Sequence, residues 1–392
     1  MISERVKQIG MSATLRVAAL AGELKRQGRD VIDFSAGQPD FPTPDEAKLA
    51  GVRAIEENHT RYTANSGMLE LREAIVQRIR RDHELDYDPG QVLVSPGAKA
   101  SLYFACMTLV DPGDEVLVPS PYWVSYPEQI RLAGGTPVFV PCRGEDGFRL
   151  DPERLAAAIT TKTKALILND PSNPTGASHS REKLRPIAEL CDRHGLWIIA
   201  DEIYSRLLYD DRKFVSVATL GDSIRERTVM INGMSKAWSM TGWRVGWTAA
   251  SPTVIDGMAK LQSHSTSNVT TISQIASMEA LNRCDAEVAR RVEAFERRRD
   301  RIVERLRGIS GVRCTVPEGA FYVLPDWSGR IEAMGGIGDG VELAEFLLRE
   351  ALVATVPGEA FGAPRHLRLS YPVPIERVDE GVDRIERALA KG

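Results

Sequence analysis

Continuous apolar runs alternate with amphipathic stretches through the middle of the chain. The runs are short and bounded by Gly, Pro, Asn, Asp or Ser, and they lie within 91–97, 114–122, 136–141, 164–170, 196–202 and 228–236. Such runs indicate strands buried on both faces, and the helical patterns between them indicate crossover connections. The pattern predicts an α/β fold in which helices flank a mostly parallel sheet. Ligands of such sheets bind beyond the carboxyl ends of the strands.

A long amphipathic helix is predicted over 286–308. Its apolar residues recur at helical spacing: Val288, Val292, Phe295, Ile302 and Leu306. The remaining positions are mostly charged. A helix of this length with a charged outer face is well suited to bridge two domains. Beyond it, residues 312–325 and 366–372 are predicted to be strands, and residues 376–392 a closing helix.

These elements divide the 392-residue chain into two domains. We expect a large domain over 45–285 and a smaller α+β domain over 286–392. The N-terminal segment, 1–44, is expected to pack with the smaller domain.

Composition and charge narrow the classes of function. The net charge is −4, which gives no electrostatic footprint for nucleic acid or for an anionic membrane. No run of eighteen apolar residues occurs, and the first twenty residues do not resemble a signal peptide. Five scattered cysteines without CxxC spacing indicate reduced thiols in the cytoplasm. Six histidines, none in an HExxH pattern, give no indication of a metal site.

Polar side chains follow several of the predicted strands. Asp201 and Tyr204 come directly after an apolar run, Asn173 lies in the turn "NPTG", and Lys236 and Arg244 follow the run 228–233. A carboxylate at the end of a buried strand is costly unless something pairs with it. Each residue alone also has a structural explanation, such as a helix cap, turn chemistry or packing. Their occurrence together favours a site.

Four motifs then occur in one order: "SPYWVSYP", "SNPTG", "DEIY" and "SKAWSMTGWRVG". With these motifs the chain resembles the fold-type I, pyridoxal-phosphate (PLP)-dependent class I aminotransferases, and most closely the bacterial aspartate aminotransferases. The resemblance extends from "GQPDFPTP" to "RLSYP". It implies transfer of the amino group of L-aspartate to 2-oxoglutarate, which forms oxaloacetate and L-glutamate. It also implies a homodimer.

The resemblance assigns three catalytic residues. Lys236 is similar to the lysine that forms a Schiff base with the cofactor aldehyde and later carries the proton at the substrate Cα. Asp201 is similar to the carboxylate that keeps the pyridine nitrogen protonated. Tyr204 is similar to the tyrosine that hydrogen-bonds the 3′-oxygen of the ring.

The remaining assignments concern cofactor and substrate. The resemblance implies that Trp123 stacks on the ring and that Asn173 bonds its 3′-oxygen. The phosphate would be held by Gly97, Ala98, Lys99, Ser235 and Arg244, and by Tyr62 of the neighbouring subunit. The substrate would be bound by Gly37, Lys99, Trp123, Asn173 and Arg368, with Arg368 on the α-carboxylate and Lys99 on the distal one.

Two departures from the family pattern bear on these assignments. Many relatives have a serine three residues before the lysine, where this chain has Gly233, so one phosphate contact is either lost or supplied by Ser235. Relatives that transaminate prephenate often carry a basic residue and a proline where Gly10 and Met11 precede Ser12, so this departure counts against prephenate as a substrate. The alternative to an aspartate aminotransferase is an aromatic, alanine or prephenate aminotransferase on the same fold. A non-catalytic PLP-binding regulator is a remote one, because residues 1–44 do not resemble a basic DNA-binding domain.

Overall fold

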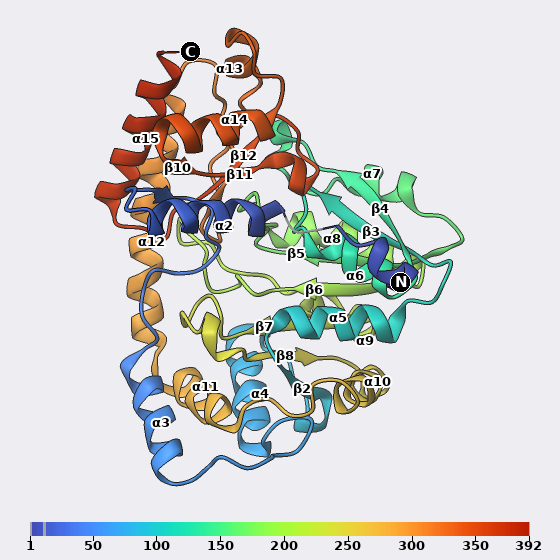
Figure 1. Ribbon diagram of the computed structural model, residues 1–392. Coiled ribbons are helices and arrows are strands. Elements are labelled where there is room, and N and C mark those ends of the chain that lie inside the picture. The colour runs from blue at the N-terminus through green and yellow to red at the C-terminus, as the bar shows by residue number, and fades with distance from the viewer. Residues whose placement is uncertain (1, 11–12, 392) are drawn as a thin grey trace.

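A seven-stranded sheet forms the centre of the computed structural model, which describes residues 2–10 and 13–391 (Figure 1). The strand order is β2-β8-β7-β6-β5-β3-β4. Strand β8 runs antiparallel to both of its neighbours, and the remaining pairs are parallel. The strands are β2 (Val92–Ser95), β3 (Glu115–Ser120), β4 (Thr136–Pro141), β5 (Thr163–Asn169), β6 (Trp197–Asp201), β7 (Thr228–Gly233) and β8 (Gly246–Ala249). The predicted α/β fold with a mostly parallel sheet is confirmed.

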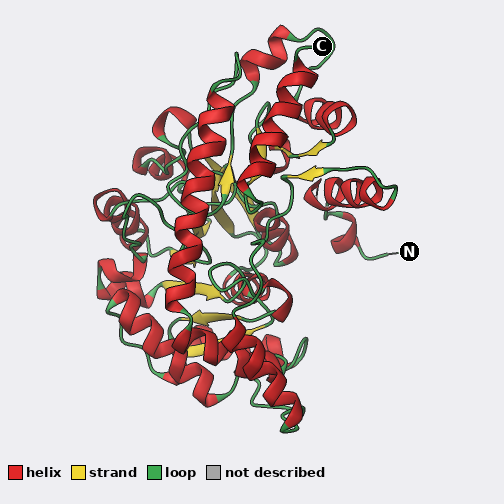
Figure 2. Ribbon diagram, turned by 90° about the vertical axis from the view of Figure 1, so that its left-hand side faces the viewer, coloured by secondary structure: helices red, strands yellow, loops and turns green. Residues whose placement is uncertain are grey.

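Helices cover both faces of this sheet, and Figure 2 shows the strands enclosed by them. On β5, Ile167 packs toward α5, α6 and α10, whereas Leu166 and Leu168 pack toward α7, α8 and α9. Neighbouring residues of one strand thus enter different cores, which explains the continuous apolar runs. These helices are α5 (Ala98–Leu109), α6 (Ser125–Leu132), α7 (Pro152–Ala158), α8 (Arg181–Arg193), α9 (Asp222–Glu226) and α10 (Pro252–Ser263).

A third core lies beside β2, β7 and β8. Val94, Met230 and Trp247 from these strands meet side chains of the helices α3 (Asp45–Glu56), α4 (Leu69–His83) and α11 (Thr271–Arg283). Short 3-10 helices connect several elements: η1 (Pro89–Gln91), η2 (Gly144–Asp146), η3 (Val217–Leu220), η4 (Thr241–Trp243) and η6 (Gly358–Phe361).

The predicted long helix is α12 (Asp285–Arg307), and it runs from the large sheet up to the C-terminal helix (Figure 1). Phe295 and Ile302 are buried, and they share a core with Val378, Val382 and Ile385 of α15 (Ile375–Leu389). The apolar stripe of α12 therefore holds the C-terminal part of the chain together.

Two small sheets complete this part of the molecule. Strands β9 (Tyr322–Val323), β11 (Val356–Pro357) and β12 (Leu367–Ser370) form an antiparallel sheet in the order β11-β12-β9. Strand β1 (Ile32–Asp33) pairs in parallel with β10 (Val353–Ala354), so it attaches the N-terminal segment to this region. The remaining helices are α1 (Glu4–Lys7), α2 (Ala13–Arg26), α13 (Ser328–Ala333), α14 (Gly340–Phe346) and the π-helix η5 (Leu347–Ala351). The domain boundaries at 44/45 and 285/286 stay a prediction.

The strand predicted over 312–325 is wrong for most of its length, since only 322–323 form one. Ala320 has a φ of 57°, and the amides of Glu318 and Gly319 both donate to the carbonyl of Gly176. The amide of Ala320 donates to Leu207. Because its backbone turns away from an extended path, this segment bonds to the loops that follow β5 and β6 in the seven-stranded sheet.

Some features concern the chain as a whole. All five cysteines are free and buried. Within residues 2–10 and 13–391, no helix is long and apolar enough to cross a membrane. In the same residues, no group of three or more His, Cys, Asp or Glu side chains could hold a metal ion.

Candidate active site

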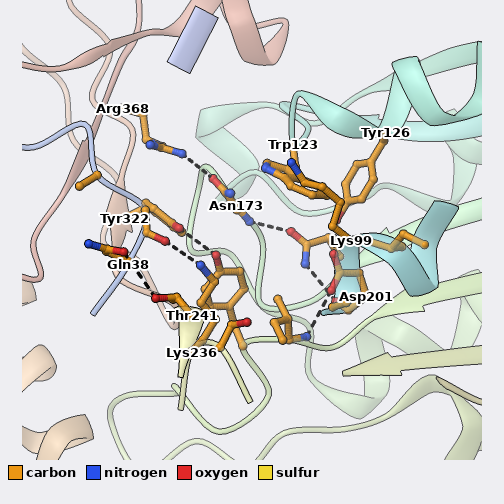
Figure 3. A pocket seen from close by; sticks show the side chains of 18 of the residues that line it. Gln38, Lys99, Trp123, Tyr126, Asn173, Asp201, Lys236, Thr241, Tyr322 and Arg368 are labelled. Carbon is orange, nitrogen blue, oxygen red and sulfur yellow. Dashed lines mark hydrogen bonds between the residues drawn. The ribbon is translucent and has the colours of Figure 1, made fainter. Parts of the chain in front are cut away.

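A cavity of about 470 Å³ lies beyond the carboxyl ends of β5, β6 and β7. All the site residues predicted from the sequence line it except Gly97 and Tyr62. The lining comes from the large-sheet loops, from the segment 35–38 and from the region of β9 and β12. Figure 3 shows how these side chains converge from opposite sides.

Strand register places the central groups. In β5 and β6, Asn169 lies beside Asp201, so two polar strand ends meet at one edge of the sheet. Strand β7 ends at Gly233, and β8 starts at Gly246 and returns antiparallel beside it. The connection between them carries Lys236 and Arg244 over the same edge, which explains why they share one segment.

Asp201 is a buried carboxylate without a cationic partner. It is 4% exposed, and among the described residues no Lys, Arg or His nitrogen lies within 4.0 Å of its oxygens. The hydroxyl of Tyr126 donates to Oδ2 at 2.6 Å, and the amide of Ile203 to Oδ1 at 3.3 Å. Burial raises the pKa of Asp201 to about 6. A cationic group placed beside it in the cavity would stabilise its charged form.

Lys236 presents an amine whose pKa is below its ordinary value. Its Nζ donates to the carbonyl of Gly37 at 2.6 Å. Burial and, after it, the charge of Arg368 lower the pKa of Lys236 to about 8. A larger fraction of this lysine is therefore neutral near pH 7 than of an exposed one, and the neutral amine is the nucleophilic form.

Arg368 is the most deeply buried cation of the cavity. Its side chain donates from Nη1 to Oδ1 of Asn173 at 3.2 Å and from Nη2 to the carbonyl of Ser35 at 2.8 Å. It is 3% exposed, and no described carboxylate lies within 4.0 Å of it. Although an arginine on a strand often faces solvent, this one points into the cavity. An unpaired buried guanidinium is suited to bind a carboxylate from a ligand.

A second cationic corner lies where β2 leads into α5. A Cβ atom at Gly97 would come within 2.5 Å of Nη2 of Arg244, so the guanidinium packs directly on this glycine. Gly97 has a φ of 82° and precedes Ala98, the first residue of α5. Free amides at a helix N-terminus next to an arginine bind phosphate readily. Ser235 is buried and lines the same cavity.

Lys99 and Trp123 line another wall of the cavity. The Nζ of Lys99 lies 4.8 Å from the centroid of the Trp123 ring. Partial desolvation by the cavity wall and, after it, the charge of Arg244 lower the pKa of Lys99, although the residue as a whole is exposed. Figure 3 shows Lys99 and Arg368 on opposite sides of the group of side chains that it draws.

Sequence reasoning missed several lining residues. Tyr126 lies in the motif "SPYWVSYP" and Asn169 at the end of a predicted strand, and these two positions were the usable signal. Gln38 and Thr241 were also missed, and each lies close to a predicted residue in the sequence, which is a weaker signal. The side-chain oxygens Oγ1 of Thr241 and Oε1 of Gln38 lie 3.5 Å apart. Tyr322 gave no signal, because an aromatic residue in an apolar run normally indicates core packing.

Tyr62 and Gly233 lie apart from the cavity. Tyr62 is 91% exposed. A Cβ atom at Gly233 would lie 2.9 Å from the carbonyl oxygen of Val245 and 3.0 Å from Cα of Gly246, so the spacing of β7 and β8 requires a glycine there. A serine at this position would first have to displace backbone.

Comparison with known proteins agrees with this geometry. The family model for aminotransferases of class I and II matches residues 29–385. The probable aspartate/prephenate aminotransferase of Aquifex aeolicus is 47% identical over 390 residues, which cover 99% of this chain and 98% of that protein. The aspartate aminotransferase of Bacillus subtilis is 44% identical, with 100% and 99% covered. The structure of Thermus thermophilus aspartate aminotransferase with maleate superposes with a TM-score of 0.94 at 42% identity, with 99% of each chain covered. This chain belongs to the class I and II aminotransferase family.

Proposed function

We propose that the chain is a PLP-dependent aspartate aminotransferase, which transfers the amino group of L-aspartate to 2-oxoglutarate. The observation that carries the proposal is Arg368, a buried cation that faces the cavity without a carboxylate partner. Lys99 supplies a second cation on another side. Two separated cations favour a substrate with two carboxylates. Maleate, which is bound by the similar Thermus thermophilus enzyme, is such a dicarboxylate.

The residues of the cavity fit PLP. Asp201 is buried without a cation, as expected for a carboxylate that pairs with a protonated pyridine nitrogen. Arg244 and the start of α5 suit the phosphate, and Lys236 supplies a partly neutral amine. When bound, PLP supplies an electrophilic aldehyde carbon and a ring that accepts electron density from the substrate Cα.

The side chains of the protein orient the substrate and move its proton. The Nζ of Lys236 removes the proton at the Cα of aspartate and, in the other half of the reaction, supplies a proton to the Cα of the glutamate that forms. Arg368, together with the backbone at Gly37, fixes the α-carboxylate, and Lys99 fixes the distal carboxylate. Tyr204 and Asn173 would hold the 3′-oxygen of PLP, and Trp123 would lie against the ring; all three line the cavity.

Donor preference tests the proposal. The purified protein, supplied with PLP and 2-oxoglutarate, is assayed with L-aspartate by coupling oxaloacetate to NADH oxidation through malate dehydrogenase. Alanine and phenylalanine are compared as donors through the L-glutamate formed. We expect a clear preference for aspartate and a loss of activity when PLP is removed. A preference for alanine or phenylalanine would contradict the assignment.

Prephenate is a second candidate acceptor. Two similar proteins, from Aquifex aeolicus and Cereibacter sphaeroides, are named aspartate/prephenate aminotransferases, at 47% and 46% identity. Prephenate also carries two carboxylates, so the same cations suit it. Of the positions that bear on this activity, Met11 and Ser12 lie outside the described residues. Formation of arogenate from prephenate and glutamate would establish the activity, and its absence would leave 2-oxoglutarate as the proposed acceptor.

A homodimer in the cytoplasm completes the proposal. Helix α3 exposes Leu49, Val52 and Ile55 by 59%, 50% and 56%, and the exposed Tyr62 follows the helix. Contiguous exposed apolar side chains favour a protein interface. We assign this surface to a second copy of the chain, with Tyr62 reaching the phosphate of the neighbouring site. The five free cysteines suit a reducing compartment.

A further inference from the structure

Tyr322 touches three of the groups that surround the proposed carboxylate site. Its hydroxyl shares a hydrogen bond of 2.8 Å with the hydroxyl of Tyr204. Its ring centroid lies 4.6 Å from Cζ of Arg368. A Cβ atom at Gly37 would lie 3.0 Å from its hydroxyl oxygen. Figure 3 shows Tyr322 between Arg368 and Lys236.

The backbone on both sides of Tyr322 is fixed. Tyr322 is 1% exposed and pairs with Ser370 of β12, two residues beyond Arg368. Before it, the amides of Glu318 and Gly319 are bonded to Gly176. The side chain of Tyr322 therefore has little freedom to change its rotamer, and its contacts to the site are fixed by the fold.

The Tyr322 ring can stabilise the charge of Arg368 while leaving its N–H groups available to a substrate, which a protein carboxylate could not do. The Cζ atom of Arg368 lies 4.6 Å from the centroid of the Tyr322 ring and 5.1 Å from that of Phe361. Aromatic faces stabilise a buried cation without neutralising its charge. A protein carboxylate would also stabilise it, but would occupy the hydrogen-bonding edge that a substrate needs. The Nε atom of Arg368 has no partner within the described structure.

We infer that Tyr322 is a positioning residue for the substrate α-carboxylate, and that its ring and its hydroxyl have separate roles. The ring holds the guanidinium of Arg368 in the plane in which it meets the carboxylate. The hydroxyl holds Tyr204 and packs against Gly37, where an added Cβ atom would press on it at 3.0 Å. This inference rests on the proposed function, because it takes the ligand of Arg368 to be an amino-acid carboxylate.

Two variants separate these roles. Tyr322→Phe keeps the ring and removes the hydroxyl, whereas Tyr322→Leu removes both. The dissociation constant of maleate is measured by calorimetry on the PLP-loaded enzymes, together with kcat and KM for aspartate. We expect Tyr322→Leu to bind maleate about 3- to 30-fold more weakly than Tyr322→Phe. We expect Tyr322→Phe to bind maleate nearly as the native enzyme does, with kcat reduced about 2- to 10-fold.

Equal maleate affinities of the two variants would overturn the role of the ring. A native enzyme that binds no maleate and does not transaminate aspartate would instead refute the proposed function. A purely structural role predicts losses in thermal stability without this division between KM and kcat.

Gly37→Ala tests the hydroxyl independently, and it stays informative if Tyr322→Leu does not fold. In the native background the added methyl meets the hydroxyl of Tyr322, and we expect KM for aspartate to rise several-fold. In the Tyr322→Phe background the hydroxyl is gone, and the nearest remaining ring atoms lie at 3.9 Å, an ordinary contact. The same substitution should then cost much less. An equal rise in both backgrounds would show that the hydroxyl does not set the position of Gly37.

Discussion

A single buried carboxylate links the chemistry of the site to the stability of the protein. Burial raises the pKa of Asp201 from 3.8 to about 6. Below pH 3.8 the group is protonated in the folded and the unfolded chain, so its ionisation does not change the free energy of unfolding. Between pH 3.8 and 6 the unfolded chain loses the proton first, and folding stability falls as the pH rises. Above pH 6 the cost is constant, on the order of 3 kcal/mol.

Asp201→Asn should therefore stabilise the cofactor-free protein while it abolishes transamination. We expect its free energy of unfolding in urea to exceed that of the native chain at pH 8 by up to about 3 kcal/mol. The difference should shrink as the pH falls from 6 toward 4. Tyr126→Phe is the matched control with the opposite sign, because it removes a hydrogen bond that lowers the pKa of Asp201. Equal stabilities of all three proteins at pH 8 would contradict this account.

Lys99 determines the preference for acidic substrates in our proposal. A charge-assisted hydrogen bond contributes about 1.5–3 kcal/mol, so Lys99→Gln should lower kcat/KM for aspartate about ten- to a hundred-fold. Activity toward phenylalanine, which has no distal carboxylate, should change little and serves as the internal control. Equal losses for both donors would mean that Lys99 serves the cofactor or the fold.

At the scale of elements, the close approach of β7 and β8 accounts for Gly233. A side chain there would meet the backbone at Val245 and Gly246. We expect Gly233→Ser to lower the free energy of unfolding by about 1–3 kcal/mol, without tighter binding of PLP. Gly90→Ser is the control, because a Cβ atom at Gly90 meets nothing within 4 Å. A stable Gly233→Ser protein with higher PLP affinity would show that the glycine costs a phosphate contact.

The parallel strands could be predicted from the sequence because each is a continuous apolar run buried on both faces. The same pattern locates the polar residues at or just beyond the ends of two of these strands, Asp201 and Asn173, but their roles were predicted from the resemblance to the family. Strand β8 was not predicted, because "GWTAA" is a short run rich in small residues, and its antiparallel direction leaves no mark on the apolar pattern. The loop at 317–320 was also missed, because its bonds go to Gly176 and Leu207, which are distant in sequence. Tyr322 lies beyond that loop, and the sequence gives no sign of its position.

At the scale of the whole molecule, the proposed homodimer makes each site dependent on two chains. Mixing Tyr62→Ala with Lys236→Ala protein under conditions that exchange subunits should restore activity, up to about a quarter of the native level for random pairing. In a hybrid dimer, one site has a native lysine and receives a native tyrosine. The control mixes Lys236→Ala with Asp201→Ala, since both residues belong to one chain's cavity and no native site can form. Restoration in the control, or a fully active monomer, would contradict shared sites.

The charge imbalance of the cavity has a consequence for the lifetime of the chain. Four cations, Lys99, Lys236, Arg244 and Arg368, line it with one carboxylate, Asp201. The empty protein keeps these charges close together, and PLP or a dicarboxylate relieves their repulsion only in the folded state. A ligand at a hundred times its dissociation constant adds about 2.7 kcal/mol to the free energy of unfolding. The concentrations of PLP and of dicarboxylate substrates would then set the resistance of the enzyme to proteolysis as well as its rate. The ligand-free enzyme would be degraded sooner than the ligand-bound one.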